Sequence, residues 1–287
     1  MSHSSFLRLA STMPADVLLS DYEPFNIIGT GKYGISSPDS VSDKTESQVR
    51  SKLAPIFKKK KTAGYSPVKS VKAVFFDMDS TVVAEETIVE LSRFAGKEKE
   101  VADITERAMN GELDFAAALA ERVATLSGLS DNVFEKVATG MTLSKGVQAF
   151  TGFCREIGVP VFLVSGGFMQ VAEHFQRKIG FQRITANVLQ VEKGLLTGRT
   201  AGPVVDANAK LAFMKDICEK LGVRMSEVAA VGDGANDLPM LQAAGVAVGF
   251  CPKPLLYEHV HAVIADGDHA FLAPLLFGRS IQHLRNR

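Results

Sequence analysis

Residues 72–81 read KAVFFDMDST, and this stretch decides the fold of the chain. Its apolar run, residues 73–76, is typical of a strand that is covered on both faces. Two carboxylates, Asp77 and Asp79, follow directly after the run. Strands of this kind belong in a parallel sheet packed between helices, where ligands bind at the carboxyl ends of the strands. We therefore expect Asp77 and Asp79 to lie at a binding site.

Three more short apolar runs follow further along the chain. They are residues 161–164, 228–231 and 246–248, and Gly, Pro or Asp residues bound them. Amphipathic segments such as 211–221 lie between the runs, so strands and helices alternate. This alternation predicts an α/β fold with a Rossmann-like, three-layer core around a parallel sheet. Because Ser165 and Asp233 follow two of the runs, we expect them at the same sheet edge as Asp77.

A long segment with helical periodicity, residues 85–144, separates the first two core strands. In its clearest helix Asp114 stands at the N-cap position. An apolar stripe at helical spacing follows, formed by Phe115, Leu119, Val123 and Leu126. We interpret the segment as a small helical cap inserted after the first strand, over the binding edge of a core made of residues 71–84 and 145–287.

Residues 1–70 differ from the rest of the chain. Residues 36–43 are rich in Ser and poor in apolar side chains, and residues 58–61 are four consecutive lysines. We expect an irregular N-terminal extension or linker that is largely disordered. The first 13 residues carry several Ser, one Arg and no acidic residue, so organellar targeting is an alternative to the cytoplasm that we expect as the compartment.

The composition excludes several kinds of partner. Lys and Arg together number 32, as do Asp and Glu, so the chain lacks the general basicity of a nucleic-acid binder. No apolar run approaches the ~18 residues needed to span a bilayer, so we expect no membrane partner. The 3 cysteines are far apart and odd in number, which suits a reducing compartment. The sequence leaves the oligomeric state open, with a homodimer as one alternative.

A second acidic group, GDGAND at residues 232–237, follows the third apolar run. Carboxylates that converge at one sheet edge repel one another unless a divalent cation or a lysine neutralises them. Magnesium suits a site made of oxygen ligands, since it binds through one or two carboxylates together with a substrate phosphate. We expect one Mg²⁺ in the active site.

Taken together, the motifs resemble those of the haloacid-dehalogenase-like phosphohydrolases. The matching stretches, in chain order, are DMDST at 77–81, SGG at 165–167, Lys210, and GDGAND at 232–237. The resemblance extends from about residue 71 to the C-terminus and is closest to the phosphoserine phosphatase family, through DST at 79–81 and VSGGF at 164–168.

The resemblance implies a role for each acidic residue. Asp77 would be the nucleophile that forms an aspartyl-phosphate, and Asp79 would be the general acid and base. Mg²⁺ would be held by Asp77, the main-chain carbonyl of Asp79 and Asp233, with Asp237 supporting them. Lys210 would balance the charge beside Asp77.

The remaining implied roles concern the substrate. Ser165, Gly166, Asn236 and Lys210 would contact its phosphate. Glu86, five residues after Thr81, would bind an amino group, and Arg122, seven residues after Phe115, would bind a carboxylate. Phe115 and Met109 would form an apolar wall over the substrate.

The function that the resemblance implies is Mg²⁺-dependent hydrolysis of O-phospho-L-serine, the last step of L-serine biosynthesis. One alternative is a phosphatase or phosphotransferase acting on another small phosphorylated amino acid, such as phosphothreonine or phosphohomoserine. The other is a phospho-ligand sensor without catalytic activity, which would not need the second carboxylate of the Asp77 and Asp79 pair.

Overall fold

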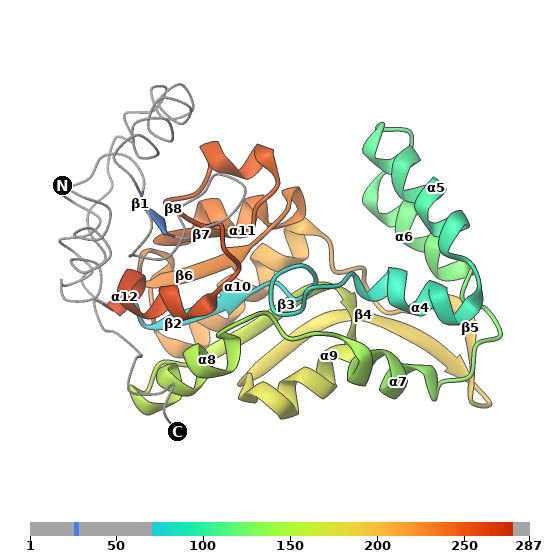
Figure 1. Ribbon diagram of the computed structural model, residues 1–287, viewed down its shortest axis with the longest axis horizontal. Coiled ribbons are helices and arrows are strands. Elements are labelled where there is room, and N and C mark those ends of the chain that lie inside the picture. The colour runs from blue at the N-terminus through green and yellow to red at the C-terminus, as the bar shows by residue number, and fades with distance from the viewer. Residues whose placement is uncertain (1–25, 29–70, 278–287) are drawn as a thin grey trace, which may run out of the picture.

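The computed structural model describes residues 26–28 and 71–277, and within them the expected α/β fold is confirmed (Figure 1). A sheet of eight strands runs through the molecule in the order β1-β8-β7-β6-β2-β3-β4-β5. The strands are β1 (Asn26–Ile28), β2 (Ala73–Phe76), β3 (Val161–Phe168), β4 (Arg183–Glu192), β5 (Leu195–Ala201), β6 (Val228–Gly232), β7 (Val246–Phe250) and β8 (Ala262–Ile264). All neighbouring strands are parallel except β4 and β5.

Helices follow most of the strands. The α-helices are α4 (Thr87–Ala95), α5 (Glu98–Met109), α6 (Phe115–Ala124), α7 (Val133–Gly140), α8 (Val147–Glu156), α9 (Met169–Phe175), α10 (Ala207–Leu221), α11 (Leu238–Ala243) and α12 (Leu272–Phe277). The short 3-10 and π turns are η1 (Gln176–Gly180), η2 (Met225–Glu227), η3 (Ala235–Asp237), η4 (Pro254–Glu258) and η5 (His269–Phe271). Among the described residues, no helix has the length and apolar character needed to cross a membrane.

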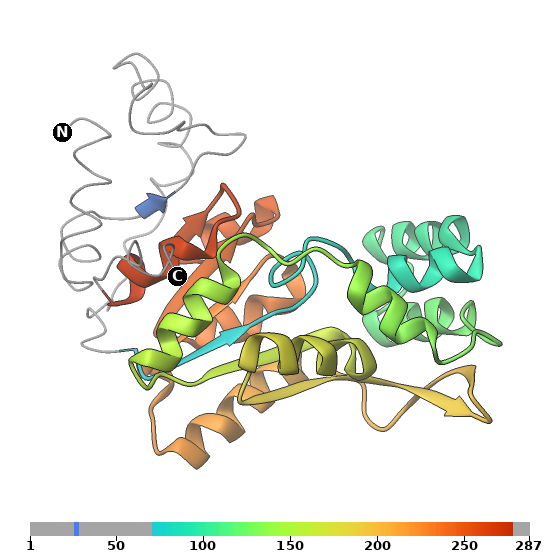
Figure 2. The same ribbon diagram turned by 60° about the horizontal axis from the view of Figure 1, so that its bottom comes forward.

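Strand β2 is buried on both faces, as its apolar sequence predicts. Ala73 and Phe75 belong to one apolar cluster, which the helices α10 and α11 complete. Val74 and Phe76 belong to the other cluster, on the side of α8 and α9. Figure 2 shows these two pairs of helices on opposite faces of the sheet. The alternation of side chains along β2 thus produces the three layers.

The register of β2 with its two neighbours brings three strand ends together. Phe76 pairs with Val231 of β6 and with Leu163 of β3. Asp77 is the next residue after Phe76, while Asp233 and Ser165 are two residues beyond Val231 and Leu163, so the parallel register places all three at one edge of the sheet, with Ser165 still within β3.

Two features of the sheet were not predicted. Strand β3 continues four residues beyond 164, and its pairing with β4 shifts register between Val164 and Phe168. Strands β4 and β5 form an antiparallel hairpin at the sheet edge. The hairpin sequence mixes polar and apolar residues because one face of it is exposed, so it lacks the continuous apolar run that marks the central strands.

Helices α4 to α7 lie within the segment interpreted as a cap. The predicted N-cap at Asp114 is confirmed, since its carboxylate accepts a hydrogen bond of 2.7 Å from the Ala117 amide. The two chain connections to the cap run side by side: Ala84 N donates to Thr142 O at 3.0 Å, and Ser144 N donates to Val82 O at 3.0 Å.

The cap is also attached to the β4–β5 hairpin. Gly128 N donates to Leu196 O, and Leu196 N donates to Leu129 O, both at 2.8 Å. Leu119 and Val123 of α6 and Leu196 of β5 belong to the same apolar cluster as Phe76. The cap is therefore packed continuously with one layer of the core.

Of the N-terminal 70 residues, the structure describes β1 alone, which pairs with β8 in parallel register, Asn26 opposite Ala262. The expected disorder of residues 1–70, the alternative of organellar targeting and the lysine run at 58–61 otherwise lie outside the described residues.

Candidate active site

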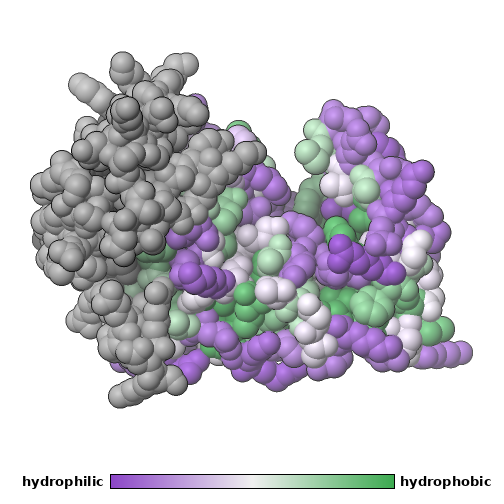
Figure 3. All heavy atoms as spheres, viewed as in Figure 1, coloured by the Kyte–Doolittle hydropathy of each residue, from purple (hydrophilic) through white to green (hydrophobic). Residues whose placement is uncertain are grey.

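A cavity opens at the carboxyl edge of the sheet, between α6 of the cap and the ends of β2, β3 and β6. Asp77, Asp79 and Asp233 line it on the core side, while Phe115 and Arg122 line it on the cap side. The space-filling view shows the surface hollowed between the lobe of α5 and α6 and the rest of the molecule (Figure 3). The expectation that the strand ends form a binding site is therefore matched by a cavity.

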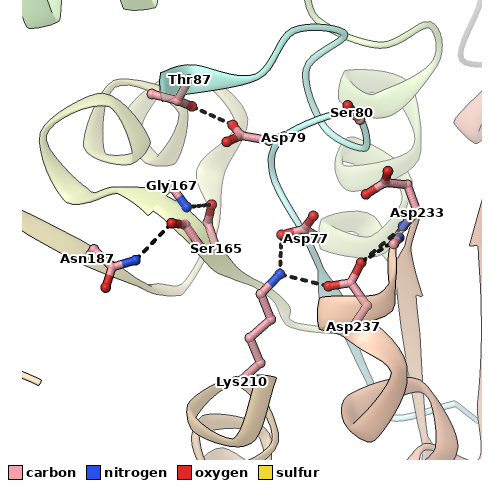
Figure 4. Close-up of polar contacts among 12 residues, drawn as sticks. Asp77, Asp79, Ser80, Thr87, Ser165, Gly167, Asn187, Lys210, Asp233 and Asp237 are labelled. Carbon is pink, nitrogen blue, oxygen red and sulfur yellow. Dashed lines mark hydrogen bonds and ion pairs between the residues drawn. The ribbon is translucent and has the colours of Figure 1, made fainter. Parts of the chain in front are cut away.

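Lys210 holds two of the carboxylates from beneath the cavity. Its Nζ donates to Asp77 Oδ1 at 2.6 Å and to Asp237 Oδ1 at 2.7 Å (Figure 4). Lys210 is fully buried on α10 and is not among the residues that line the cavity, so in this structure its ammonium contacts Asp77 and Asp237. Burial would lower the pKa of Lys210, but Asp237 and Asp77 outweigh it and raise that pKa, so the ammonium stays charged.

Asp237 shapes the loop that carries Asp233. Its Oδ2 accepts from the amides of Asp233 and Gly234, both at 3.1 Å. A Cβ on Gly232 would lie 2.5 Å from this Oδ2, so a residue without a side chain is required there. Since both oxygens of Asp237 are occupied, it fits a supporting role better than that of a metal ligand.

The acidic residues carry more negative charge than the lysine neutralises. Ligand oxygens of Asp77, Asp233 and Asp237 all lie within 4.8 Å of one another, and all three residues are buried. Burial raises the pKa of Asp77, with a further rise from Asp237, and burial raises that of Asp233 to about 6. The buried Lys210 ammonium pairs with Asp77 and Asp237, and Asp233 has only the long pair with the exposed Lys253, so the three buried carboxylates form a site that suits a divalent cation with oxygen ligands.

Asp79 occupies a different environment from Asp77. Thr87, at the start of α4, donates a hydrogen bond to Asp79 Oδ1 (Figure 4). Burial, and then the charge of Glu86, raise the pKa of Asp79 to about 7, although the Thr87 bond opposes the rise. A carboxyl with this pKa can give up a proton and take one back near neutral pH, as a general acid and base must.

The last four residues of β3 include groups that suit an anion. Ser165 Oγ accepts a hydrogen bond of 2.8 Å from Gly167 N, so its own proton is directed elsewhere. Asn187 Nδ2 donates to Gly166 O at 2.8 Å and fixes the peptide that follows Ser165. A Cβ on Gly167 would lie 3.0 Å from Asp79 Oδ2, which explains why glycine stands there. Ser165 and Gly166 both line the cavity.

The two residues expected to recognise an amino acid also line the cavity. Glu86 precedes α4 and accepts a hydrogen bond of 2.8 Å from Ser80 Oγ. Arg122, on α6, uses its Nε to donate to Ala118 O at 3.1 Å. Burial lowers the pKa of Arg122 while Glu86 raises it, so the two side chains sense each other's charge across the cavity.

Phe115 and Asn236 line the cavity as expected, but Met109 does not. The Met109 side chain is 83% exposed at the end of α5. Phe115 instead lies close to the end of β3: a Cβ on Gly166 would be 3.4 Å from the Cζ atom of Phe115. The apolar wall of the cavity is completed by Ile88 and Leu119 in the arrangement observed.

Sequence reasoning missed three residues of the site. They are Thr87, which binds Asp79, Asn187, which fixes Gly166, and Lys253, which lines the cavity beside Asp233. Lys253 follows the end of β7, so the rule that ligands gather at the carboxyl ends of strands could have identified it. Asn187 lies in the hairpin strand β4, which carried no sequence signal.

Comparison with known proteins gives consistent matches. A family model described as haloacid dehalogenase-like hydrolase matches residues 71–245. Phosphoserine phosphatase from Streptococcus thermophilus is 46% identical over 192 residues, 67% of this chain and 89% of that protein. Phosphoserine phosphatase SerB2 from Mycobacterium tuberculosis is 41% identical over 209 residues, 73% of this chain and 50% of that protein. A solved phospho-aspartyl intermediate analogue of phosphoserine phosphatase matches with a TM-score of 0.65 at 38% identity, over 70% of this chain and 96% of that one.

Proposed function

Because the chain belongs to the haloacid dehalogenase-like hydrolases and, among them, to the phosphoserine phosphatases, we propose that its cavity binds O-phospho-L-serine and hydrolyses it to L-serine and phosphate. This reaction is the last step of L-serine biosynthesis.

The observation that carries the proposal is the distribution of charge around the cavity. Glu86 and Arg122 line one part of it and can pair with an ammonium and a carboxylate. Ser165 and the amide of Gly166 lie on the core side, where they can donate to phosphate oxygens. Phosphoserine carries all three charged groups, so each of these contacts has a partner on one small molecule.

In the first step, an oxygen of Asp77 attacks phosphorus. Lys210 donates to Oδ1 of Asp77 and restrains the carboxylate, while Oδ2 accepts no hydrogen bond from the side chains that the structure describes. The bond between phosphorus and the serine oxygen breaks, and Asp79 transfers its proton to that oxygen, so that serine leaves as an alcohol. The products of this step are serine and an aspartyl-phosphate on Asp77.

In the second step, Asp79 acts as a base. It removes a proton from a water molecule whose oxygen attacks phosphorus, and the bond between phosphorus and Asp77 breaks. Phosphate leaves and Asp79 is again protonated, ready for the next cycle. The pKa of about 7 serves both steps, because each requires the opposite protonation state.

Asp77, Asp233 and the main-chain carbonyl of Asp79 would hold Mg²⁺. When bound, the ion would offset the repulsion between an anionic nucleophile and an anionic phosphate. Asp237 and Lys210 keep the surrounding carboxylates in place. Asn236 would help to orient the phosphate or the attacking water.

Phe115 would cover the phosphate side of the substrate and exclude bulk water. Met109 would join this wall only if the end of α5 moved toward the core, because its side chain faces solvent.

The test compares phosphate release from L-phosphoserine, L-phosphothreonine and p-nitrophenyl phosphate, with Mg²⁺ or EDTA, for wild type, Asp77→Asn and Arg122→Ala. We expect a strong preference for phosphoserine and loss of turnover with EDTA or Asp77→Asn. Arg122→Ala should reduce turnover of phosphoserine far more than that of p-nitrophenyl phosphate, because p-nitrophenyl phosphate has no carboxylate for Arg122 to bind.

Each alternative gives a distinct result. Equal turnover of all three esters, unaffected by Arg122→Ala, would leave a phosphatase without the proposed substrate. Preference for phosphothreonine would identify a different phosphorylated amino acid. Absence of Mg²⁺-dependent turnover of any ester would indicate a phospho-ligand sensor.

A further inference from the structure

Lys253 stands at the edge of the cavity, directly after β7 and the residues Cys251 and Pro252. Its backbone N donates to Asp233 O at 2.8 Å, which anchors the main chain of Lys253 to the loop after β6. Its Nζ lies 3.5 Å from Asp233 Oδ2, and its side chain is 64% exposed. An anchored main chain with a loosely paired ammonium places a mobile positive charge at the site.

Lys253 lies on the core side of the cavity, where the phosphate is expected, and not on the cap side. A Cβ on Gly234 would lie 2.7 Å from Asn236 Oδ1 and 3.5 Å from Lys253 Nζ, so both side chains flank this glycine. Asn236 Nδ2 in turn lies 4.0 Å from the point where a Cβ on Gly166 would be. Lys253, Asn236 and Gly166 therefore follow one another along the core wall, where the phosphate is expected.

Among the residues that the structure describes, Lys253 and Arg122 are the cationic side chains that line the cavity. Lys210 is fully buried, and its ammonium is shared between Asp77 and Asp237. Arg122 lines the cavity from the cap, at the place assigned to the substrate carboxylate. A phosphate dianion bound beside three carboxylates needs a positive partner from the protein, and Lys253 has the position to supply one.

We propose that Lys253 is a substrate-binding residue that exchanges its ion pair with Asp233 for an ion pair with the substrate phosphate. The inference rests on the proposed function for the identity of the ester. With Asp233 engaged in holding a divalent cation, the Lys253 ammonium loses its carboxylate partner, and the phosphate becomes the nearest anion on its wall. The N–O distance of 3.5 Å and the exposure of the Lys253 side chain make its pair with the buried Asp233 weak, so this exchange costs little free energy.

The chain offers a matched control in Lys220. That lysine is also exposed, at 59%, and pairs with one carboxylate, Asp216, at 2.7 Å, but it does not line the cavity. The variants are Lys253→Met, Lys253→Arg and Lys220→Met. Their steady-state kinetics with L-phosphoserine are measured at saturating Mg²⁺, and calorimetry measures the binding of inorganic phosphate in Mg²⁺ and of Mg²⁺ alone.

We expect Lys253→Met to raise KM for phosphoserine and to weaken the binding of inorganic phosphate, each by about tenfold, with kcat changed less than about twofold. Lys253→Arg should recover most of both losses because it keeps the charge. Mg²⁺ should bind Lys253→Met at least as tightly as wild type, since a competing cation has been removed from Asp233. Lys220→Met should match wild type throughout.

Three results would overturn the proposal. The first is a KM and a phosphate affinity in Lys253→Met equal to those of Lys220→Met. The second is weaker binding of Mg²⁺ to Lys253→Met than to wild type, which would show that Lys253 acts by shaping the Asp233 loop. The third is a raised KM with unchanged affinity for inorganic phosphate, which would place Lys253 against another group of the substrate. If wild type does not hydrolyse phosphoserine, the proposed function fails, while calorimetry with inorganic phosphate still tests Lys253.

Discussion

The Nζ atom of Lys210 lies 2.6 Å from Oδ1 of Asp77, and both side chains are buried beneath the cavity. Lys210 comes from α10 and Asp77 from the end of β2, 133 positions apart in the sequence. The pair joins a helix of one outer layer to the central strand and sets the orientation of the proposed nucleophile. Its loss should therefore affect stability and turnover together.

Replacing Lys210 with Met should leave two buried carboxylates, those of Asp77 and Asp237, without their ammonium. Breaking a buried ion pair from one side costs roughly 3–5 kcal/mol, so we expect the free energy of unfolding to fall by about that amount in metal-free buffer. Turnover of phosphoserine should fall by roughly 10²- to 10³-fold even at saturating Mg²⁺, because Asp77 is no longer held. Urea unfolding and steady-state kinetics measure the two effects.

The control for Lys210→Met is Lys220→Met, which lies on the same helix. The exposed ion pair of Lys220 with Asp216 should contribute less than about 1 kcal/mol to the free energy of unfolding. An Lys210→Met protein as stable and active as Lys220→Met would contradict the role assigned to the buried lysine.

Asp233→Asn should distinguish two effects of the Asp233 carboxylate, namely its cost to stability without metal and its contribution to Mg²⁺ binding. In metal-free buffer the variant should be more stable than wild type, because it removes a buried carboxylate whose pKa is raised to about 6 by desolvation. We expect Tm to rise by about 2–4 °C for each kcal/mol gained. Mg²⁺ should raise the Tm of wild type but not that of the variant, and the variant should not turn over phosphoserine.

Asp216→Asn is the matched control for Asp233→Asn, since Asp216 is an exposed carboxylate paired with Arg183 and Lys220. It should keep the Mg²⁺-dependent rise in Tm. An equal Mg²⁺ response in Asp233→Asn and wild type would remove Asp233 from the proposed metal site.

The central sheet and the acidic centre could be predicted from sequence because each depends on a continuous local pattern. Ala73 to Phe76 is apolar throughout, and so the strand had to be covered on both faces. Asp77 and Asp233 directly follow such strands, and the parallel register then brings them together. Asp114 predicted the start of α6 because an N-cap side chain accepts a hydrogen bond from the backbone amide three residues later, here that of Ala117.

What could not be predicted depends on contacts between distant segments. Asn187 lies in an edge hairpin that has no apolar run, yet it fixes Gly166 from 21 residues away. The exposure of Met109 depends on how far the end of α5 lies from the core, which spacing within the cap does not report. Whether Lys210 faces a ligand or the protein depends on the depth of α10 below the cavity.

His269 should make stability depend on pH. It is fully buried, its ring stacks on Phe250 at 3.9 Å, and its Nε2 lies 2.9 Å from Thr81 O. Burial lowers its pKa from 6.5 to about 4, although Thr81 and Asp268 oppose the shift. The unfolded chain therefore binds more protons between these values, so the stability that His269 contributes is complete above pH 6.5 and is lost as pH falls toward 4.

Between pH 6.5 and pH 4, the free energy of unfolding of wild type should fall by about 3 kcal/mol more than that of a variant without the imidazole. His269→Gln is expected to be less stable than wild type at pH 7, because it loses the stack on Phe250. The difference should shrink, or change sign, when urea unfolding is repeated at pH 4.5. A difference that stays constant between the two pH values would show that His269 does not titrate as proposed.

Thr87 should set the position of the alkaline limb of the pH profile through its hydrogen bond to Asp79. That bond favours the ionised carboxylate, so Thr87→Val should raise the pKa of Asp79 above its value of about 7. Protonated Asp79 is needed for serine to leave, and turnover of phosphoserine should therefore persist to higher pH, by about one pH unit. Thr87→Ser keeps the hydroxyl and should follow the wild-type profile.

With p-nitrophenyl phosphate, whose leaving group needs no proton, the alkaline limb should not move in Thr87→Val. A shift of the same size for both esters would mean that Thr87 acts on the site in general and not on the proton held by Asp79.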